Sequence, residues 1–107
     1  MIVNINWYRN YYKGSSVSLK TLMAEHKEDE IVIMLESWQR YLPKKKNVTL
    51  RVLLNQLGNI RCEYLGEESP HFNDEGYLDF VCWPESETDR TNKENGIHVA
   101  IGVRSET

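Results

Sequence analysis

The sequence predicts an α+β fold in which a largely antiparallel sheet of about six strands carries one helix on a face. Short segments in which apolar and polar side chains alternate recur along the chain, as in half-buried strands. One segment has helical spacing, and most connections between segments are short, which favours antiparallel neighbours. With 107 residues, the chain is predicted to form a single domain, 1–107, with the element order β-α-β-β-β-β-β.

The N-terminal part of the chain predicts a strand followed by a helix. In residues 2–8, apolar side chains alternate with Asn4 and Asn6, so one face of a strand would be buried. Ser18 is a suitable N-cap because its hydroxyl accepts a hydrogen bond from a free amide of the first helical turn. Leucines at helical spacing follow it, and we expect a helix over 19–26.

Residues 31–35 are five consecutive apolar side chains, and two interpretations of them are open. They form either a central strand that is covered on both faces or part of one long helix from Leu19 to Leu42. We favour the strand because three of the five residues are β-branched and because the charged segment 27–30 interrupts helical amphipathicity.

The second half of the chain predicts four more strands, from alternating side chains, at 48–54, 60–64, 77–83 and 97–103. A short segment containing Gly58 joins the first two, which is typical of a β-hairpin. Residues 66–76 are predicted to be a polar loop. Residues 84–95 are charged or polar and have no apolar anchor, so they are either a mobile loop or a segment that a partner orders.

Charge is divided unevenly along the chain. Residues 1–60 carry nine Lys or Arg and five Asp or Glu, a net charge of +4, whereas residues 61–95 carry three and ten, a net charge of −7. An acidic surface disfavours nucleic acid and favours a basic protein partner, although it can also be simply a solvated face. The sequence shows no signal peptide and no apolar run that spans a membrane, so we expect a cytoplasmic location.

No motif in the sequence predicts catalysis, a cofactor or a metal site. The six glycines are scattered, so there is no phosphate-binding loop, and no Ser stands in a nucleophile elbow. Paired Cys and His spacings that would bind zinc are absent. The two cysteines, Cys62 and Cys82, each stand in an apolar strand-like segment, and we expect both to be buried and reduced. We therefore predict that the protein is not an enzyme.

The candidate binding residues lie at the ends of predicted strands, where acidic side chains and one Trp come together in the sequence. Interfaces use aromatic anchors surrounded by charged residues, and a meander brings strand ends to one edge of a sheet. Trp83 would be the anchor, unless it ends its strand inside the core. The predicted partner-binding residues are Glu67, Glu68, Asp74, Glu75, Trp83, Glu85, Glu87 and Asp89.

The tract from Val48 through Trp83 resembles the small α+β immunity proteins of bacterial polymorphic-toxin systems. The resemblance rests on the order of VTLRVLL, IRCEYLGEE and GYLDFVCW, and on VSLKTLMAEH, which is similar to the family's opening helix. It is closest to the type that guards against deaminase and nuclease toxins. The resemblance implies a non-enzymatic inhibitor that covers the active site of a cognate toxin. The alternatives are a phage-encoded inhibitor of a host defence nuclease and a small ligand-binding domain or enzyme.

Overall fold

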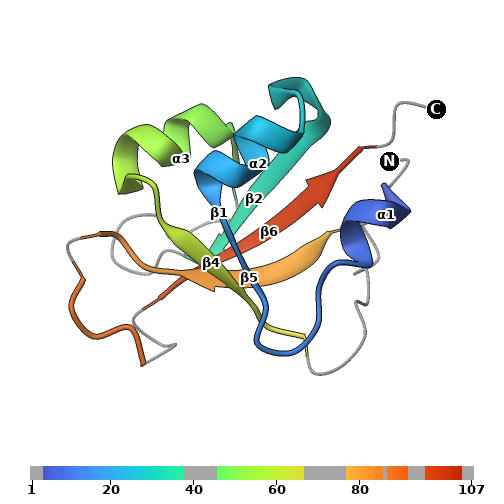
Figure 1. Cartoon of the computed structure of the whole chain (residues 1–107). Coiled ribbons are helices and arrows are strands. Elements are labelled where there is room, and N and C mark those ends of the chain that lie inside the picture. Colours follow the sequence, from blue (N-terminus) through green and yellow to red (C-terminus); the bar gives the residue numbers. More distant parts are fainter. Residues whose placement is uncertain (1–3, 38–45, 67–76, 86, 92–95, 105–107) are drawn as a thin grey trace.

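The structure, a computed structural model, describes residues 4–37, 46–66, 77–85, 87–91 and 96–104. It confirms the α+β class: a six-stranded antiparallel sheet has the strand order β1-β4-β5-β6-β2-β3 (Figure 1). The strands are β1 (Ser16–Ser18), β2 (Ile31–Ser37), β3 (Lys46–Val48), β4 (Arg61–Tyr64), β5 (Leu78–Cys82) and β6 (Ile97–Val103). The helices are α1 (Ile5–Tyr8), α2 (Leu19–Glu25), the 3-10 turn η1 (Glu28–Glu30) and α3 (Leu50–Leu57).

Helices α2 and α3 lie side by side over one face of the sheet (Figure 1). They close a single core because their leucines face the apolar side chains of the strands. An aromatic cluster extends this core: Trp7 and Tyr11 pack edge to face with ring centroids 4.9 Å apart, and Tyr11 lies 5.3 Å from Phe80 of β5. Within the described residues, no helix is long and apolar enough to cross a membrane.

Residues 2–8 were predicted to be a strand, and for the described residues of this segment the prediction is wrong. Residues 5–8 form helix α1, and Asn4 is its N-cap, with a side chain that accepts a hydrogen bond from the backbone N–H of Trp7 at 3.1 Å. A single helical turn buries the adjacent rings of Trp7 and Tyr8 together, while Ile5 stays 43% exposed. The burial of these rings outweighs the alternating pattern.

The strand and hairpin predicted at 48–54 are also wrong. Strand β3 ends at Val48, the first residue of the predicted strand. Thr49 then caps helix α3 by accepting a hydrogen bond from the backbone N–H of Val52 at 3.2 Å. Leu50, Leu53 and Leu57 recur at helical spacing, and all three are buried on one side of the helix. Gly58 ends the helix with a φ of +81°, a conformation that suits glycine.

The remaining predicted elements are confirmed within one or two residues. The apolar run at 31–35 lies in strand β2, between β6 and β3, and is not part of a long helix. Helix α2 begins after Ser18, whose hydroxyl accepts a hydrogen bond from the N–H of Thr21 at 3.1 Å. Six strands, the number predicted, lie within the described residues, because β1 and β3 take the place of the two incorrect strands.

The face of the sheet opposite the helices carries the groups that matter for the site. Alternation along β4 and β5 places Arg61, Glu63 and Asp79 on this outer face, and all three are exposed. Val81 shares that face and is buried, and β4 and β5 are held in register by the pairing of Glu63 with Val81.

Candidate functional site

The end of the sheet near Trp83 contains a cleft of about 510 Å³, which we call the Trp83 cleft. Its lining residues come from the turn before β1 and the start of β1, from β4 and the two residues before it, and from the segment after β5. They are Gly14, Ser16, Asn59, Ile60, Arg61, Glu63, Trp83, Glu85 and Arg90. Pairing of β1 with β4 brings Ser16 opposite Glu63, and the Arg61 guanidinium donates to the Ser16 hydroxyl at 3.1 Å. Among these lining residues, two carry guanidinium groups and two carry carboxylates: Arg61, Arg90, Glu63 and Glu85.

Trp83 forms part of the cleft from within the protein, because it is only 4% exposed. Its indole lies against the backbone at the start of β6, where a Cβ added to Gly96 would come within 3.2 Å of the ring and 2.4 Å of a Val81 methyl. Glycine at position 96 is thus needed for the close approach of β6 to this ring. An indole in this position supports the neighbouring segment, and a partner reaches it only after a rearrangement.

Three acidic residues stand in the described part of the segment after β5, and we call Glu85, Glu87 and Asp89 the acidic segment. Arg90 orders it from within: its guanidinium donates to the backbone carbonyls of Glu85 and Glu87, each at 3.2 Å. The Glu87 carboxylate accepts from the N–H of Asp89 at 3.2 Å, and the Asp89 carboxylate accepts from the Thr91 hydroxyl at 2.7 Å. Hydrogen bonds within the described part of 84–95 therefore link its residues to one another.

The acidic segment also rests against the end of helix α3. A Cβ built on Gly58 would lie 2.6 Å from the carboxyl carbon of Glu85, so the Glu85 side chain packs directly on that glycine. The C-cap of α3 thereby fixes the position of one carboxylate. This contact joins two segments that are far apart in the sequence, and alternation and capping patterns do not predict it.

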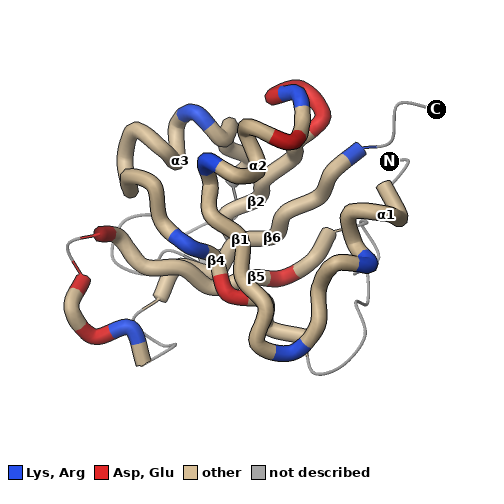
Figure 2. The backbone as a smooth tube through the Cα atoms, in the orientation of Figure 1, with Lys and Arg blue, Asp and Glu red and all other residues tan. Residues whose placement is uncertain are grey.

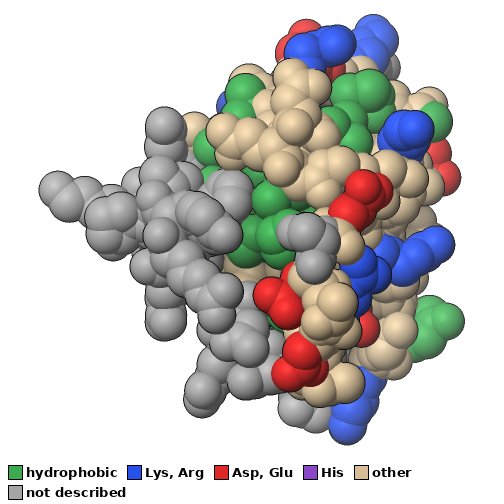
Figure 3. All heavy atoms as spheres, turned by 90° about the vertical axis from the view of Figure 1, so that its left-hand side faces the viewer, with side chains coloured by type: hydrophobic (Ala, Val, Ile, Leu, Met, Phe, Trp, Pro, Cys, Tyr) green, Lys and Arg blue, Asp and Glu red, His purple; other side chains and the backbone are tan. Residues whose placement is uncertain are grey.

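Of the predicted partner-binding residues, Trp83, Glu85, Glu87 and Asp89 lie together at this end of the molecule. Figure 2 shows the acidic positions on the loop beyond β5, and Figure 3 shows acidic and basic side chains next to each other on that side. The other four, Glu67, Glu68, Asp74 and Glu75, lie outside the described residues. Sequence reasoning missed Arg61, Glu63 and Arg90, although charged residues on the outer positions of β4 were a visible signal.

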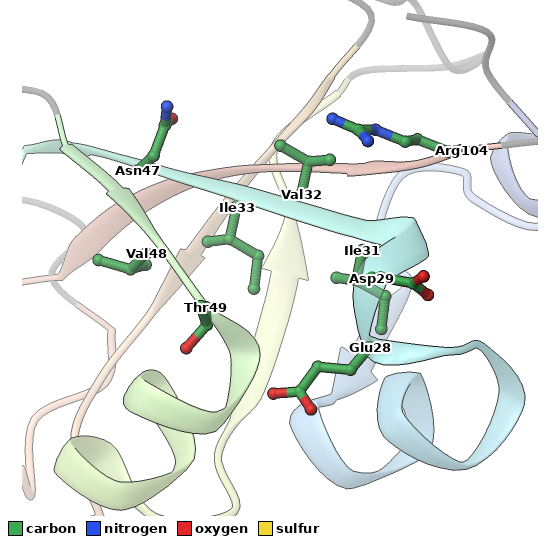
Figure 4. A pocket seen from close by; sticks show the side chains of 9 residues that line it. All are labelled: Glu28, Asp29, Ile31, Val32, Ile33, Asn47, Val48, Thr49 and Arg104. Atoms are coloured by element: carbon green, nitrogen blue, oxygen red, sulfur yellow. The ribbon is translucent and has the colours of Figure 1, made fainter.

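A second cleft, the β2-edge groove, lies between η1 and the start of α3 (Figure 4). It measures about 650 Å³, and its lining residues are Glu28, Asp29, Ile31, Val32, Ile33, Asn47, Val48, Thr49 and Arg104. Its rim is held by an ion pair between Arg51 of α3 and Glu28 at 3.3 Å, and by a 2.8 Å hydrogen bond from the Arg104 N–H to the Glu30 carbonyl. Acidic and basic groups occur together here as well.

Neither cleft assembles a metal centre from described residues, where no three His, Cys, Asp or Glu side chains gather closely enough to hold an ion. No protein-family model, curated protein or solved structure matches this chain. The charges, burial and geometry of the two clefts and the acidic segment are therefore the basis for a function.

Proposed function

We propose that the protein is a non-enzymatic inhibitor that binds a basic protein partner through the acidic segment, as an immunity protein binds its cognate toxin. The observation that carries the proposal is the fixed geometry of Glu85, Glu87 and Asp89. Arg90 donates to the backbone carbonyls of Glu85 and Glu87, and the Glu85 carboxylate packs on Gly58. These contacts reduce the conformational entropy that the segment loses when a partner binds. Carboxylates held in this way would meet the Lys, Arg or His side chains of a nuclease or deaminase active site.

Charge complementarity supports a protein partner more than a nucleic acid. The acidic segment follows directly from β5, and Glu63 and Asp79 add exposed carboxylates on the outer face of the sheet. Such a surface repels phosphates and attracts a basic protein, whose association it accelerates. An inhibitor encoded by a phage and aimed at a host defence nuclease would use the same surface.

A small ligand-binding domain is the second candidate, because both clefts fall in the size range of ligand pockets. Ligand pockets are lined mostly by apolar and aromatic side chains, with few polar groups. Four charged side chains line the Trp83 cleft, and its one aromatic ring is buried. For this reason we favour protein recognition.

The proposal is tested by measuring the affinity of the chain for the product of the gene directly upstream, the position of a toxin gene in an immunity operon. We expect a 1:1 complex whose affinity falls at least tenfold in the double variant Glu85→Lys/Glu87→Lys. The reason is that lysines in place of the carboxylates would repel the basic groups of the partner. Circular dichroism and thermal unfolding establish that the variant is folded.

The matched control is Glu25→Lys/Asp29→Lys, which changes the net charge equally at exposed positions of α2 and η1. It should bind like the wild type. If the Glu85→Lys/Glu87→Lys variant also binds like the wild type, the acidic segment is only a solvated surface and the proposed interface is wrong.

A further inference from the structure

The two cysteines, predicted to be buried and unpaired, are both free thiols with 0% exposure. They lie opposite each other in the sheet. Strands β4 and β5 pair antiparallel with Glu63 opposite Val81, so one step along each strand places Cys62 opposite Cys82. The two side chains are in contact on the helix-covered face, where the Cys82 thiol also donates to the carbonyl of Ile97 at 3.7 Å.

The hydrogen-bond pattern of the sheet fixes the kind of pair that the cysteines form. The same register places Leu65 opposite Asp79, and the N–H of Leu65 donates to the carbonyl of Asp79 at 3.0 Å. Leu65 and Asp79 are therefore a hydrogen-bonded pair. Hydrogen-bonded and non-hydrogen-bonded pairs alternate along an antiparallel ladder. Cys62 is three positions from Leu65, so Cys62 and Cys82 are a non-hydrogen-bonded pair. Cα atoms in such pairs are about 4.5 Å apart, and disulfides span Cα separations of about 4.4–6.8 Å.

We propose that Cys62 and Cys82 are an oxidisable cross-strand dithiol, which a low-molecular-weight disulfide such as glutathione disulfide converts to a disulfide that ties β4 to β5. One cysteine thiolate attacks the glutathione disulfide and releases one glutathione. The second cysteine thiolate then attacks the mixed disulfide and releases the other. The two thiol protons end on the two glutathiones, and the protein loses two electrons.

Burial determines how this oxidation proceeds. The contact with Cys62 and the loss of solvation both raise the pKa of the Cys82 thiol, so little thiolate is present in the closed sheet. Helices α2 and α3 cover the face of the sheet that carries both thiols, so the oxidant reaches them only when this layer opens locally. We therefore expect slow formation of the disulfide but a favourable equilibrium.

The oxidation state of this pair bears on the Trp83 cleft. Arg61 precedes Cys62 and Trp83 follows Cys82, so the strands that the disulfide would join also carry the cleft. A covalent bond between them would hold these two strands in register at the point where the cleft begins. The inference itself rests on the strand register and is independent of the proposed function.

The test compares disulfide formation in the folded and in the urea-unfolded wild-type chain, each equilibrated with glutathione buffers of graded ratio. The oxidised chain is identified by mass, because it is lighter by two hydrogen atoms, and by a peptide that links Cys62 with Cys82. We expect the equilibrium constant to be at least about tenfold larger in the folded chain, a potential about 30 mV lower. An equal or smaller constant in the folded chain would overturn the proposal, as would a product that carries glutathione.

A register control separates the geometry of the strands from mere proximity in the sequence. In the variant Cys82→Ala/Val81→Cys, the second thiol moves to the outer face, but its separation along the chain hardly changes. Its oxidation in urea should match that of the wild type, and folding should give it no advantage. If folding favours its disulfide as strongly as in the wild type, the proposed pairing is wrong.

Discussion

Tyr11 links the aromatic cluster to the stability of the protein at alkaline pH. It is 6% exposed, and burial raises the pKa of its phenol far above the usual value of about 10. In the unfolded chain the phenol ionises near pH 10, whereas in the folded chain it stays protonated. The free energy of unfolding is therefore fully retained below about pH 10 and falls as the pH rises above it. Burial also raises the pKa of Tyr8, to about 12, and this adds to the same loss.

We predict that Tyr11→Phe makes the unfolding free energy less dependent on pH above about pH 10, because one of the phenols whose pKa is raised by burial no longer titrates. Urea unfolding at about pH 8 and about pH 11 measures the effect. Tyr12→Phe is the matched control, since Tyr12 is 65% exposed, and its pH dependence should equal that of the wild type. Equal pH dependence for all three proteins would refute the assignment.

The burial of Trp83 changes what its substitution is expected to do. Truncation of a buried Trp leaves a cavity and typically costs about 3–5 kcal/mol. We predict that Trp83→Ala lowers the unfolding free energy by about 3 kcal/mol or more in urea unfolding. The exposed Tyr12→Ala should cost less than about 0.5 kcal/mol. An unchanged stability for Trp83→Ala would instead support the role of a surface anchor for a partner.

At the scale of single elements, the sequence predicted β2, β4, β5 and β6 because their alternation or solid apolar character coincides with their burial. It misplaced α3 because Val48, Leu50, Val52 and Leu54 alternate by chance. The helix forms instead because leucines at 50, 53 and 57 bury a continuous side, and because Thr49 and Gly58 are present as caps. Weighing the caps before the alternation would have identified it.

The cap at Thr49 provides a test of α3. We predict that Thr49→Ala lowers the unfolding free energy by about 1 kcal/mol, because the N–H of Val52 loses its acceptor. Thr49→Ser should retain most of the stability, since Ser also caps helices. Thr88→Ala, at an exposed position outside any helix, is the control and should have little effect. Thermal unfolding distinguishes these outcomes, and equal losses at both positions would argue against the cap.

For the whole molecule, sequence reasoning predicted that the acidic residues at 67–75 and those after Trp83 would lie together on one edge of the sheet, and of these only the second group lies within the described residues. It did not predict that Arg90 and Gly58 hold them in place, since the packing of Glu85 on the end of α3 depends on tertiary contacts. The division of charge is also less complete in space than along the chain. Figure 2 shows acidic and basic positions together on the helix layer.

This distribution determines how association with a basic partner should respond to salt. Because the helix layer mixes both signs, the acidic segment and the outer carboxylates Glu63 and Asp79 are the main source of attraction. We predict that the association rate falls by about tenfold when the Debye length shrinks from about 10 Å at 0.1 M salt to about 3 Å at 1 M. Stopped-flow mixing with the upstream gene product at graded salt concentrations measures this.

The variants Glu85→Lys/Glu87→Lys and Glu25→Lys/Asp29→Lys locate the source of that salt dependence. Both change the net charge of the protein by the same amount, so a difference between them reports position and not total charge. Reversal of the acidic segment should flatten the salt dependence. Reversal on α2 and η1 should leave most of it, because those sites lie on the helix layer, far from the acidic segment (Figure 2). Equal flattening by both variants would mean that net charge alone steers the partner. In that case the fixed geometry of the acidic segment would have no part in the encounter.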